Sequence, residues 1–143
     1  MNINEFDFAK ANEDIGQNEI KDHKFYRVHG VTYAMSHGDI EDYDRILLIA
    51  APSAAHAQVW AEMHYLIGSK FDTHQELKET LAENVVDEEK SQYSSFRFIG
   101  CIDIGDYKYR CIDNVKEITK EYAHLMYEHD DFYDTNISAN AFS

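Results

Sequence analysis

The hydrophobic pattern of the chain predicts two strands before the first long helix. Residues 24–35 are rich in aromatic and β-branched side chains, which is typical of a strand, and Gly30 among them indicates a bulge or bend. Residues 36–44 (SHGDIEDYD) are polar, and we expect them to form a loop. The apolar run at 45–51 (RILLIAA) then predicts a short strand buried on both faces, which Pro52 ends.

Two helices are predicted in the middle of the chain. Ser53 is a good N-cap for a helix that runs to about Ile67, and Gly68 provides a stop. The apolar face of this helix holds His56, Val59, Trp60, Met63 and Ile67. A second helix fits residues 72–88, with His74, Leu77, Leu81 and Val85 along one face.

A β-hairpin is the clearest element of the second half. Residues 96–104 and 107–112 alternate apolar and polar side chains, and the Gly-Asp pair between them is typical of a two-residue turn. This turn predicts a register in which Ile104 pairs with Tyr107. The chain therefore has a well-defined strand pair to set beside its first two strands.

The two cysteines both fall in this hairpin. In the predicted register Cys111 pairs with Gly100, so Cys101 and Cys111 point to opposite faces. A disulfide between them is then disfavoured by geometry. Two cysteines in 143 residues also do not form a disulfide framework.

The last helix is predicted to begin at Asn114, because Asn114 and Glu117 resemble a capping box. The acidic tail at 129–143 is expected to be partly frayed, and residues 1–22 form a polar segment with a short helix near 9–20. The order is β-β-α-α-β-β-α, which predicts an α+β fold with a small antiparallel sheet and about three helices in one compact domain, residues 1–143. A duplicated ββα unit would explain the similar outline of the two halves, although ββα is also a common unit.

The distribution of charged residues suggests a candidate function in addition to a fold. The chain has 27 acids against 13 bases, which gives a net charge of -14, and nearly all of the excess lies in residues 39–44, 72–89 and 129–143. Such a surface repels nucleic acid and membranes and attracts basic proteins. We see no signal peptide and no run long enough to span a bilayer, which favours a cytoplasmic protein, or one in a host cytoplasm if the gene belongs to a mobile element.

The acids of the predicted second helix form the sharpest local signal. Their spacing of three and four places them on a stripe roughly 80° wide, with charges about 4.5–6 Å apart along the axis. Phosphates of one DNA strand repeat about every 3.4 Å, so the row is of the right order to imitate them. The candidate interaction residues are this stripe and the acids of the first polar loop: Asp72, Glu76, Glu79, Glu83, Asp87, Asp39, Glu41, Asp42 and Asp44. A solvated face that only keeps the protein soluble is the alternative interpretation.

Other chemistry is weakly supported by the sequence. Glu121 and His124 have the i,i+3 spacing of di-iron bundles, but a second pair is missing, so His124 is expected to be a surface residue and no metal is predicted. His56 lies with Trp60 and is expected to be a packed core histidine. No phosphate-binding loop, dinucleotide fingerprint or zinc-protease motif occurs, so no cofactor is predicted.

Three functions follow as hypotheses. The first is a non-enzymatic interaction protein, such as a phage or mobile-element inhibitor that imitates nucleic acid and docks on the basic surface of a DNA- or RNA-binding defence protein. The second is a homo-oligomeric module, for example a homodimer, that binds a small ligand in a cleft lined by His56, Trp60 and tyrosines. The third is an enzyme that uses histidine and carboxylates. Direct binding of nucleic acid or membrane is not expected.

Overall fold

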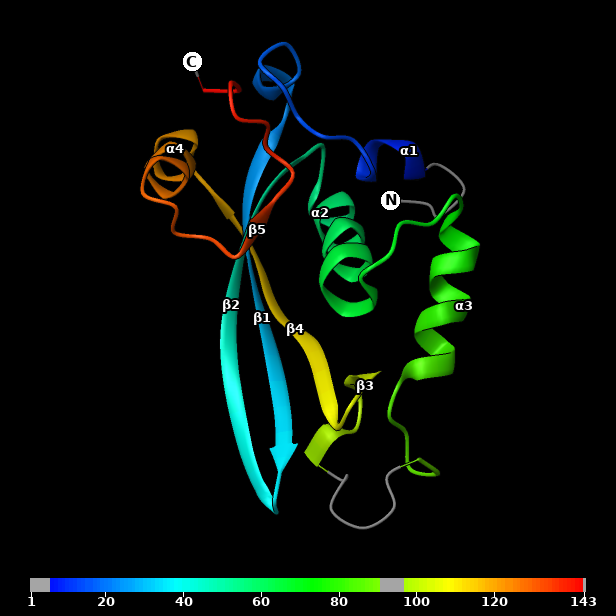
Figure 1. Cartoon of the computed structure of the whole chain (residues 1–143). Helices are drawn as coiled ribbons and strands as arrows, with labels where there is room; N and C mark the ends of the chain where they lie inside the picture. The colour runs from blue at the N-terminus through cyan, green and yellow to red at the C-terminus, as the bar shows by residue number, and fades with distance from the viewer. Residues whose placement is uncertain (1–5, 91–96, 143) are drawn as a thin grey trace.

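The structure is a computed structural model, and it describes residues 6–90 and 97–142. Its elements are α1 (Phe8–Ala11), the 3-10 helix η2 (Ile20–Asp22), β1 (Lys24–Ser36), β2 (Asp39–Ala51), α2 (Ala54–Ala61), the π-helix η3 (Glu62–Ile67), α3 (His74–Asn84), β3 (Ile102–Gly105), β4 (Lys108–Ile118), α4 (Lys120–Glu128) and β5 (Asp134–Thr135). The expected α+β class with a small sheet is confirmed (Figure 1). The described residues contain four α-helices, of which the short α1 precedes the sheet.

The sheet has five strands in the order β3-β4-β1-β2-β5. The long strands pair antiparallel, as expected, because β1 and β2 form one hairpin and β4 runs back along β1. The short β5 pairs parallel with Leu47 and Leu48 of β2, so the sheet is mixed rather than purely antiparallel. This last strand comes from the tail and has no hydrophobic run of its own to predict it.

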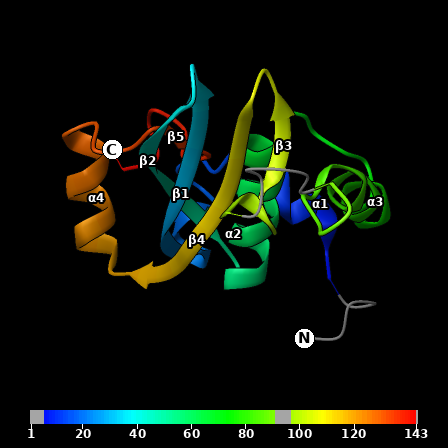
Figure 2. The ribbon, with the colours of Figure 1, turned by 90° about the horizontal axis from the view of Figure 1, so that it is seen from below.

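Helices cover the two faces of the sheet unequally (Figure 2). Seen from below, α4 lies on one side of the sheet, α2 lies on the other, and α1 and α3 lie beyond α2. The core under α2 and η3 contains Val28, Leu47 and Trp60, whereas Leu48 and Met126 belong to the core under α4. Neighbouring residues of one strand thus serve opposite cores, because side chains alternate across a strand.

Residues 36–44 form the tip of a long hairpin and not the polar loop expected from the sequence. The turn lies at His37 and Gly38, which both have positive φ (51° and 84°), and β2 begins at Asp39. Strand pairing with β1 extends over the whole acidic run, from Asp39 opposite Ser36 to Asp44 opposite Val31. Acids are tolerated there because they are exposed on an edge strand, so polarity alone was a poor guide to the loop.

The second hairpin has a different register from the expected one. Asp106 and Tyr107 both have positive φ (54° and 59°), so they form the two-residue turn, which is displaced by one residue from the Gly-Asp pair. As a result Ile102 pairs with Arg110 rather than with Tyr109. β3 begins only at Ile102, and the part of the expected strand at 97–101 is a turn that packs on the sheet; Phe96 lies outside the described residues.

The last helix begins later than the predicted capping box. Asn114 lies within β4, opposite His29, and Thr119 is the true N-cap of α4, since its side chain accepts a hydrogen bond from the Tyr122 amide at 3.1 Å. The prediction failed because β4 gains its hydrogen bonds from β1, which a capping pattern in the sequence does not reveal.

The tail is docked rather than frayed over its described residues. The buried Asn136 side chain accepts from the Ala50 amide at 2.9 Å and donates to the Ala50 carbonyl at 2.7 Å. Ile137 is buried beside Ile15, and the two residues form an isolated parallel β-bridge. The tail therefore completes the core under α4, and Ile15 and Ile20 of the polar N-terminal segment pack into the same core. From residue 6 onward, that segment contains the short α1 and η2 in place of a helix at 9–20.

The two ββα halves do not repeat each other's geometry. The strands β1 and β2 have 13 residues each, whereas β3 has 4. The helices that follow the two hairpins, α2 and α4, also pack on opposite faces of the sheet (Figure 2). The similar outline in the sequence therefore does not extend to the arrangement in space.

Candidate functional site

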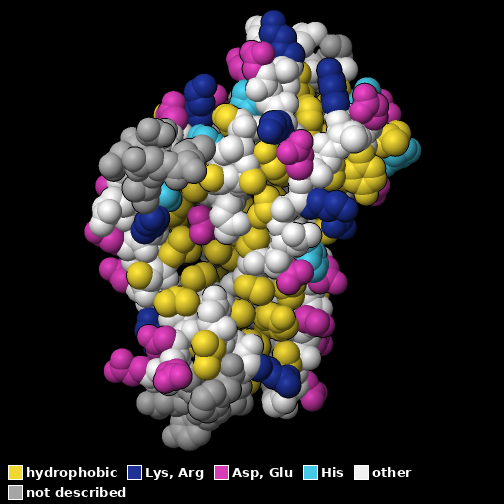
Figure 3. All heavy atoms as spheres, turned by 180° about the vertical axis from the view of Figure 1, so that it is seen from behind, with side chains coloured by type: hydrophobic (Ala, Val, Ile, Leu, Met, Phe, Trp, Pro, Cys, Tyr) yellow, Lys and Arg dark blue, Asp and Glu magenta, His cyan; other side chains and the backbone are white. Residues whose placement is uncertain are grey.

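All nine acidic candidate residues are exposed, but they fall into two separate groups. Asp39, Glu41, Asp42 and Asp44 lie on β2, whereas Asp72, Glu76, Glu79, Glu83 and Asp87 lie on or beside α3. β2 lies toward the β5 edge of the sheet, whereas α3 contacts β3 at the opposite edge. Figures 1 and 3 show the same separation, with carboxylates gathered mainly along the two sides of the face in Figure 3. The acids do not form one continuous surface.

The stripe on α3 is shorter than predicted. The helix starts after the Thr73 N-cap and ends at Asn84, so Asp72 and Asp87 lie outside it. Glu76, Glu79 and Glu83 remain as a row on its solvent side. Part of this charge is engaged locally, because Gln75 donates to Glu79 at 2.8 Å.

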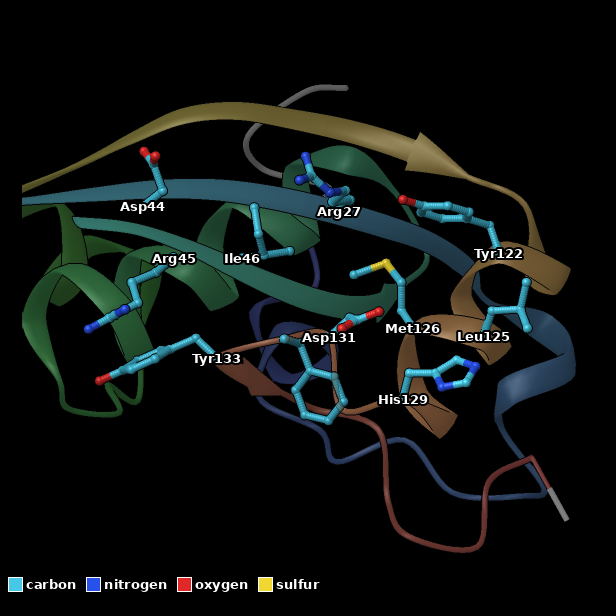
Figure 4. A pocket seen from close by; sticks show the side chains of 11 residues that line it. Arg27, Asp44, Arg45, Ile46, Tyr122, Leu125, Met126, His129, Asp131 and Tyr133 are labelled. Atoms are coloured by element: carbon cyan, nitrogen blue, oxygen red, sulfur yellow. The ribbon is translucent and has the colours of Figure 1, made fainter.

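A groove between α4 and the sheet gathers a different set of side chains (Figure 4). We call it the α4 groove, and its volume is about 620 Å³. It is lined by Arg27, Asp44, Arg45, Ile46, Tyr122, Leu125, Met126, His129, Asp131, Phe132 and Tyr133. It joins the acidic edge strand β2 to the tail, so it unites two of the three acidic runs of the sequence.

Aromatic and apolar side chains are unusually exposed around the α4 groove. Tyr122 is 48% exposed, Leu125 is 55% exposed and Tyr133 is 54% exposed. In Figure 4, Tyr122 and Leu125 lie at the α4 end of the groove, and Tyr133 lies at the other end. Exposed apolar groups on one patch, mixed with polar ones, are typical of a binding surface.

Arg45 is held in place by two tyrosine rings. Its guanidinium carbon lies 5.0 Å from the centre of the Tyr133 ring and 5.6 Å from that of Tyr43. Figure 4 shows Arg45 and Tyr133 side by side at one end of the groove. These contacts are cation–π interactions, which position the arginine without using its N–H donors. Among the described residues no hydrogen bond from Arg45 is found, so these donors could reach a carboxylate or carbonyl of a partner.

His29, on the central strand β1, forms hydrogen bonds with two acidic side chains near the α4 groove. Its Nε2 lies 2.9 Å from Oδ1 of Asp44, and its Nδ1 lies 3.0 Å from Oδ2 of Asp113. The hydrogen bond with Asp113, aided by that with Asp44, raises the pKa of His29 above its ordinary value, against the opposing effect of burial. Protonated His29 therefore partly neutralises the acids beside the groove.

The outer edge of β2 is free along the acidic run. β5 pairs with β2 only at Leu47 and Leu48, and the Tyr133 amide donates to the Ile46 carbonyl at 2.6 Å, so the described chain leaves the backbone from Asp39 to Arg45 unpaired on that side. An edge of this kind can accept another strand, and charged side chains discourage unwanted pairing. The acids thus have a structural role as well as a potential role in binding.

The residues of the second hypothesis are packed and do not line an open cleft. His56 is 5% exposed and Trp60 is 3% exposed, which confirms the core histidine that the sequence predicts. Phe6 stacks on the His56 ring at 4.4 Å, and His64 stacks on Trp60 at 4.1 Å. Burial lowers the pKa of His56 and of His64, so both favour the neutral form.

Three ring nitrogens in this packed region have no hydrogen-bond partner among the described residues. They are Nε2 of His56, Nε1 of Trp60 and Nε2 of His64. Buried polar atoms of this kind usually have a partner, so their concentration along one helix distinguishes this region from the rest of the core. His124, by contrast, is half exposed and lies 2.9 Å from Glu128, as expected for a surface residue.

The α4 groove was not predicted from the sequence. Its aromatic residues belong to α4 and the tail, and its arginines belong to β1 and β2. The available signal was the aromatic residues of the last helix and the tail, such as Tyr122, Phe132 and Tyr133, but aromatic residues also fit a core edge. Only the docking of the tail onto β2 brings these groups together.

Within the described chain, no cluster of His, Cys, Asp or Glu has the geometry of a metal site, and no helix could cross a membrane. Comparison with protein-family models, curated proteins and solved structures found no match to this chain.

Proposed function

We propose that this protein is a non-enzymatic interaction protein, and that it docks the α4 groove onto a basic surface of a nucleic-acid-binding protein. The single observation that carries the proposal is one groove beside an acidic edge that exposes Tyr122 and Leu125 at one end and Tyr133, stacked with Arg45, at the other. Tyrosine and arginine are enriched among the residues that dominate binding energy in interfaces. An inhibitor that occupies the nucleic-acid site of a defence protein is one function of this class.

Charge supports the choice of a basic partner. Residues 39–51 and 128–135, which border the α4 groove, hold eight carboxylates and one arginine. The net charge of the chain is also -14, so long-range attraction would steer a basic surface toward it. The proposal relies on the β2 and tail acids, because the α3 row lies on the other side of the molecule.

The decisive experiment compares two variants in affinity capture from host lysate. The groove variant is Leu125→Ala with Tyr133→Ala, both of which remove exposed side chains. The matched control is Glu76→Gln, Glu79→Gln and Glu83→Gln, which removes three charges from α3. We expect the groove variant to lose a basic nucleic-acid-binding protein that wild type and control both retain, and added DNA or RNA to compete for it.

The affinity for the captured protein, once purified, should depend on salt. Raising salt from about 50 to about 500 mM should weaken the complex about tenfold or more, because exposed charges are screened. Retention of every partner by the groove variant would contradict the docking surface. Loss of the partner by the α3 control would show that the α3 row is the binding face instead.

Binding of a small polar ligand along α2 is the second candidate function. The unpartnered nitrogens of His56, Trp60 and His64 favour it. It ranks second because Phe6 covers His56, so the segment that precedes α1 would have to move aside. A change of Trp60 fluorescence on addition of metabolite pools, lost in His64→Gln, would support it, and an unchanged spectrum would count against it.

A further inference from the structure

The observed register of the second hairpin places the two cysteines opposite each other. Asp103 pairs with Tyr109 and Ile102 pairs with Arg110. Cys101 directly precedes β3, and this register extended by one residue would place Cys101 opposite Cys111, on the same face of the two strands. Both side chains belong to one apolar cluster with Phe98. The one-residue shift in register thus reverses the expectation that the cysteines point apart.

The backbone of Cys101 shows which kind of cross-strand position the pair occupies. The Cys101 amide donates to the Phe98 carbonyl at 2.9 Å, and the Cys101 carbonyl accepts from the Val86 amide at 2.8 Å. Cys101 therefore exchanges no backbone hydrogen bonds with Cys111. At such non-hydrogen-bonded positions the Cα atoms of an antiparallel pair are about 4.5 Å apart. This separation lies within the range of about 4.4–6.8 Å that a disulfide needs.

The two thiols are close enough for each to alter the pKa of the other, and they differ in their surroundings. Cys101 is buried, and burial raises its pKa to about 12, whereas Cys111 is less buried and its interaction with the Cys101 side chain partly offsets the increase in its pKa. Cys111 therefore ionises first and is the nucleophile of the pair.

We propose that Cys101 and Cys111 are a redox-active pair that forms a cross-strand disulfide when a low-molecular-weight disulfide such as oxidised glutathione is the oxidant. The Cys111 thiolate attacks one glutathione sulfur, which forms a mixed disulfide and releases one glutathione thiolate. Cys101 then loses its proton to solvent and attacks Cys111 Sγ, which releases the second glutathione. Two thiols are oxidised, and one glutathione disulfide is reduced to two thiols.

The disulfide would fasten residues 97–101, the segment just before β3, to the sheet. That segment holds Phe98, whose ring stacks on Tyr109 at 4.4 Å and covers Tyr33. Just after α3, the backbone of Val86 forms hydrogen bonds with the Gly100 amide and the Cys101 carbonyl. Oxidation would therefore tie β3 and the end of α3 to β4, at the edge of the sheet away from the α4 groove.

The experiment exposes the full-length protein to a glutathione redox buffer at mildly alkaline pH, and in a parallel sample refolds it from urea in the same buffer. We expect a monomer whose intact mass is lower by two hydrogen atoms. Trypsin cuts after Lys108 and Arg110, between the cysteines, so the two peptides should stay joined until a reductant is added. The oxidised protein should also unfold at a higher urea concentration than the reduced one.

Single variants identify the order of the two steps. Cys101→Ser should accumulate the glutathione adduct at Cys111, because the second thiol that resolves it is missing. Cys111→Ser should form its adduct more slowly, because Cys101 is the more buried thiol. Two free thiols after refolding of the wild type, a persistent mixed disulfide, or dimers linked between chains would each overturn the proposal. In the refolded sample glutathione can reach both thiols before the protein folds, so a negative result there cannot be due to burial of the cysteines.

Discussion

At the scale of single residues, one glycine fixes how η3 approaches the sheet. A Cβ atom on Gly30 would lie 2.5 Å from Cε2 of Tyr65, so the fully buried tyrosine ring occupies the space that any side chain would need. The Tyr65 hydroxyl lies 2.7 Å from Oγ1 of Thr32, and Arg110 donates to the Tyr65 carbonyl at 2.8 Å. This buried polar group therefore holds the ring in place, and the glycine is a packing requirement.

Gly30→Ala should lower the free energy of unfolding by about 2 kcal/mol or more, because the new methyl group overpacks a site that cannot relax. Urea denaturation checks this prediction. Gly16→Ala is the matched control, since its Cβ would meet only the flexible Glu19 side chain at 3.1 Å. Equal effects of the two substitutions would show that the Gly30–Tyr65 contact is unimportant.

At the scale of elements, strand pairing overrides local helix signals at the end of β4. Asn114 and Glu117 resemble a helix start, yet both pair with β1. Thr119 instead begins α4. An N-cap contributes only about 1 kcal/mol, whereas each added residue of a strand gains ladder hydrogen bonds and buried side chains. The longer strand is therefore more stable than an earlier helix start, and α4 begins at a position from which its side chains line the α4 groove.

Thr119→Ala should destabilise the protein by about 1 kcal/mol, because the Tyr122 amide loses its cap. Asn114→Ala, an exposed position, should change stability by less than about 0.5 kcal/mol. Urea denaturation of both variants tests the assignment. A larger loss of unfolding free energy for Asn114→Ala than for Thr119→Ala would indicate that Asn114 caps the helix, as predicted from the sequence.

At the scale of the whole molecule, the N-terminal segment, α2 and α3 share an interface of aromatic and histidine rings. Phe6 stacks on His56 at 4.4 Å and on His74 at 5.0 Å. Burial lowers the pKa of His56, His64 and His74 below the ordinary value of 6.5. These histidines are neutral in the fold, and acid would favour the unfolded chain, which binds protons more readily.

Stability should therefore fall as pH decreases from about 7 through 6.5, because the unfolded chain takes up protons there that the fold excludes. His29 acts in the opposite sense, because its raised pKa contributes stability below pH 6.5 that is lost as pH rises through the pKa of the folded state. We expect the three histidines with lowered pKa to outweigh it, because His29 is a single, partly exposed group. Urea denaturation at several pH values should show a shallower dependence for His64→Gln. An unchanged slope would exclude a role for His64.

The separation of the acidic groups also has a consequence for the whole molecule. Like charges on α3 repel by a few tenths of a kcal/mol per pair, and salt screens them. The triple variant Glu76→Gln, Glu79→Gln and Glu83→Gln should thus be more stable than wild type by about 0.5 kcal/mol at low salt. Thermal unfolding should show the difference shrinking at high salt. A less stable variant would mean that these glutamates make stabilising contacts in the fold.

Elements with strong local signals could be predicted from the amino-acid sequence. The strand at β1, the buried end of β2, and the long helix with its Ser53 cap and Gly68 stop follow from periodicity and turn chemistry. The exposure of all nine candidate acids and the burial of His56 follow from composition and spacing as well. These properties depend on residues close together in the chain, so a one-dimensional pattern contains them.

The contacts between residues distant in the sequence depend on how the elements pack and could not be predicted. A one-residue change of turn in the second hairpin moved Cys101 from the face opposite Cys111 to a position beside it, because side chains alternate along a strand. The docking of Asn136 on Ala50 ordered a tail that its composition suggested was loose, and this built the α4 groove. Three-dimensional packing also placed α3 and β2 on opposite sides, so the net charge of -14, fixed by the sequence, is divided between separate surfaces.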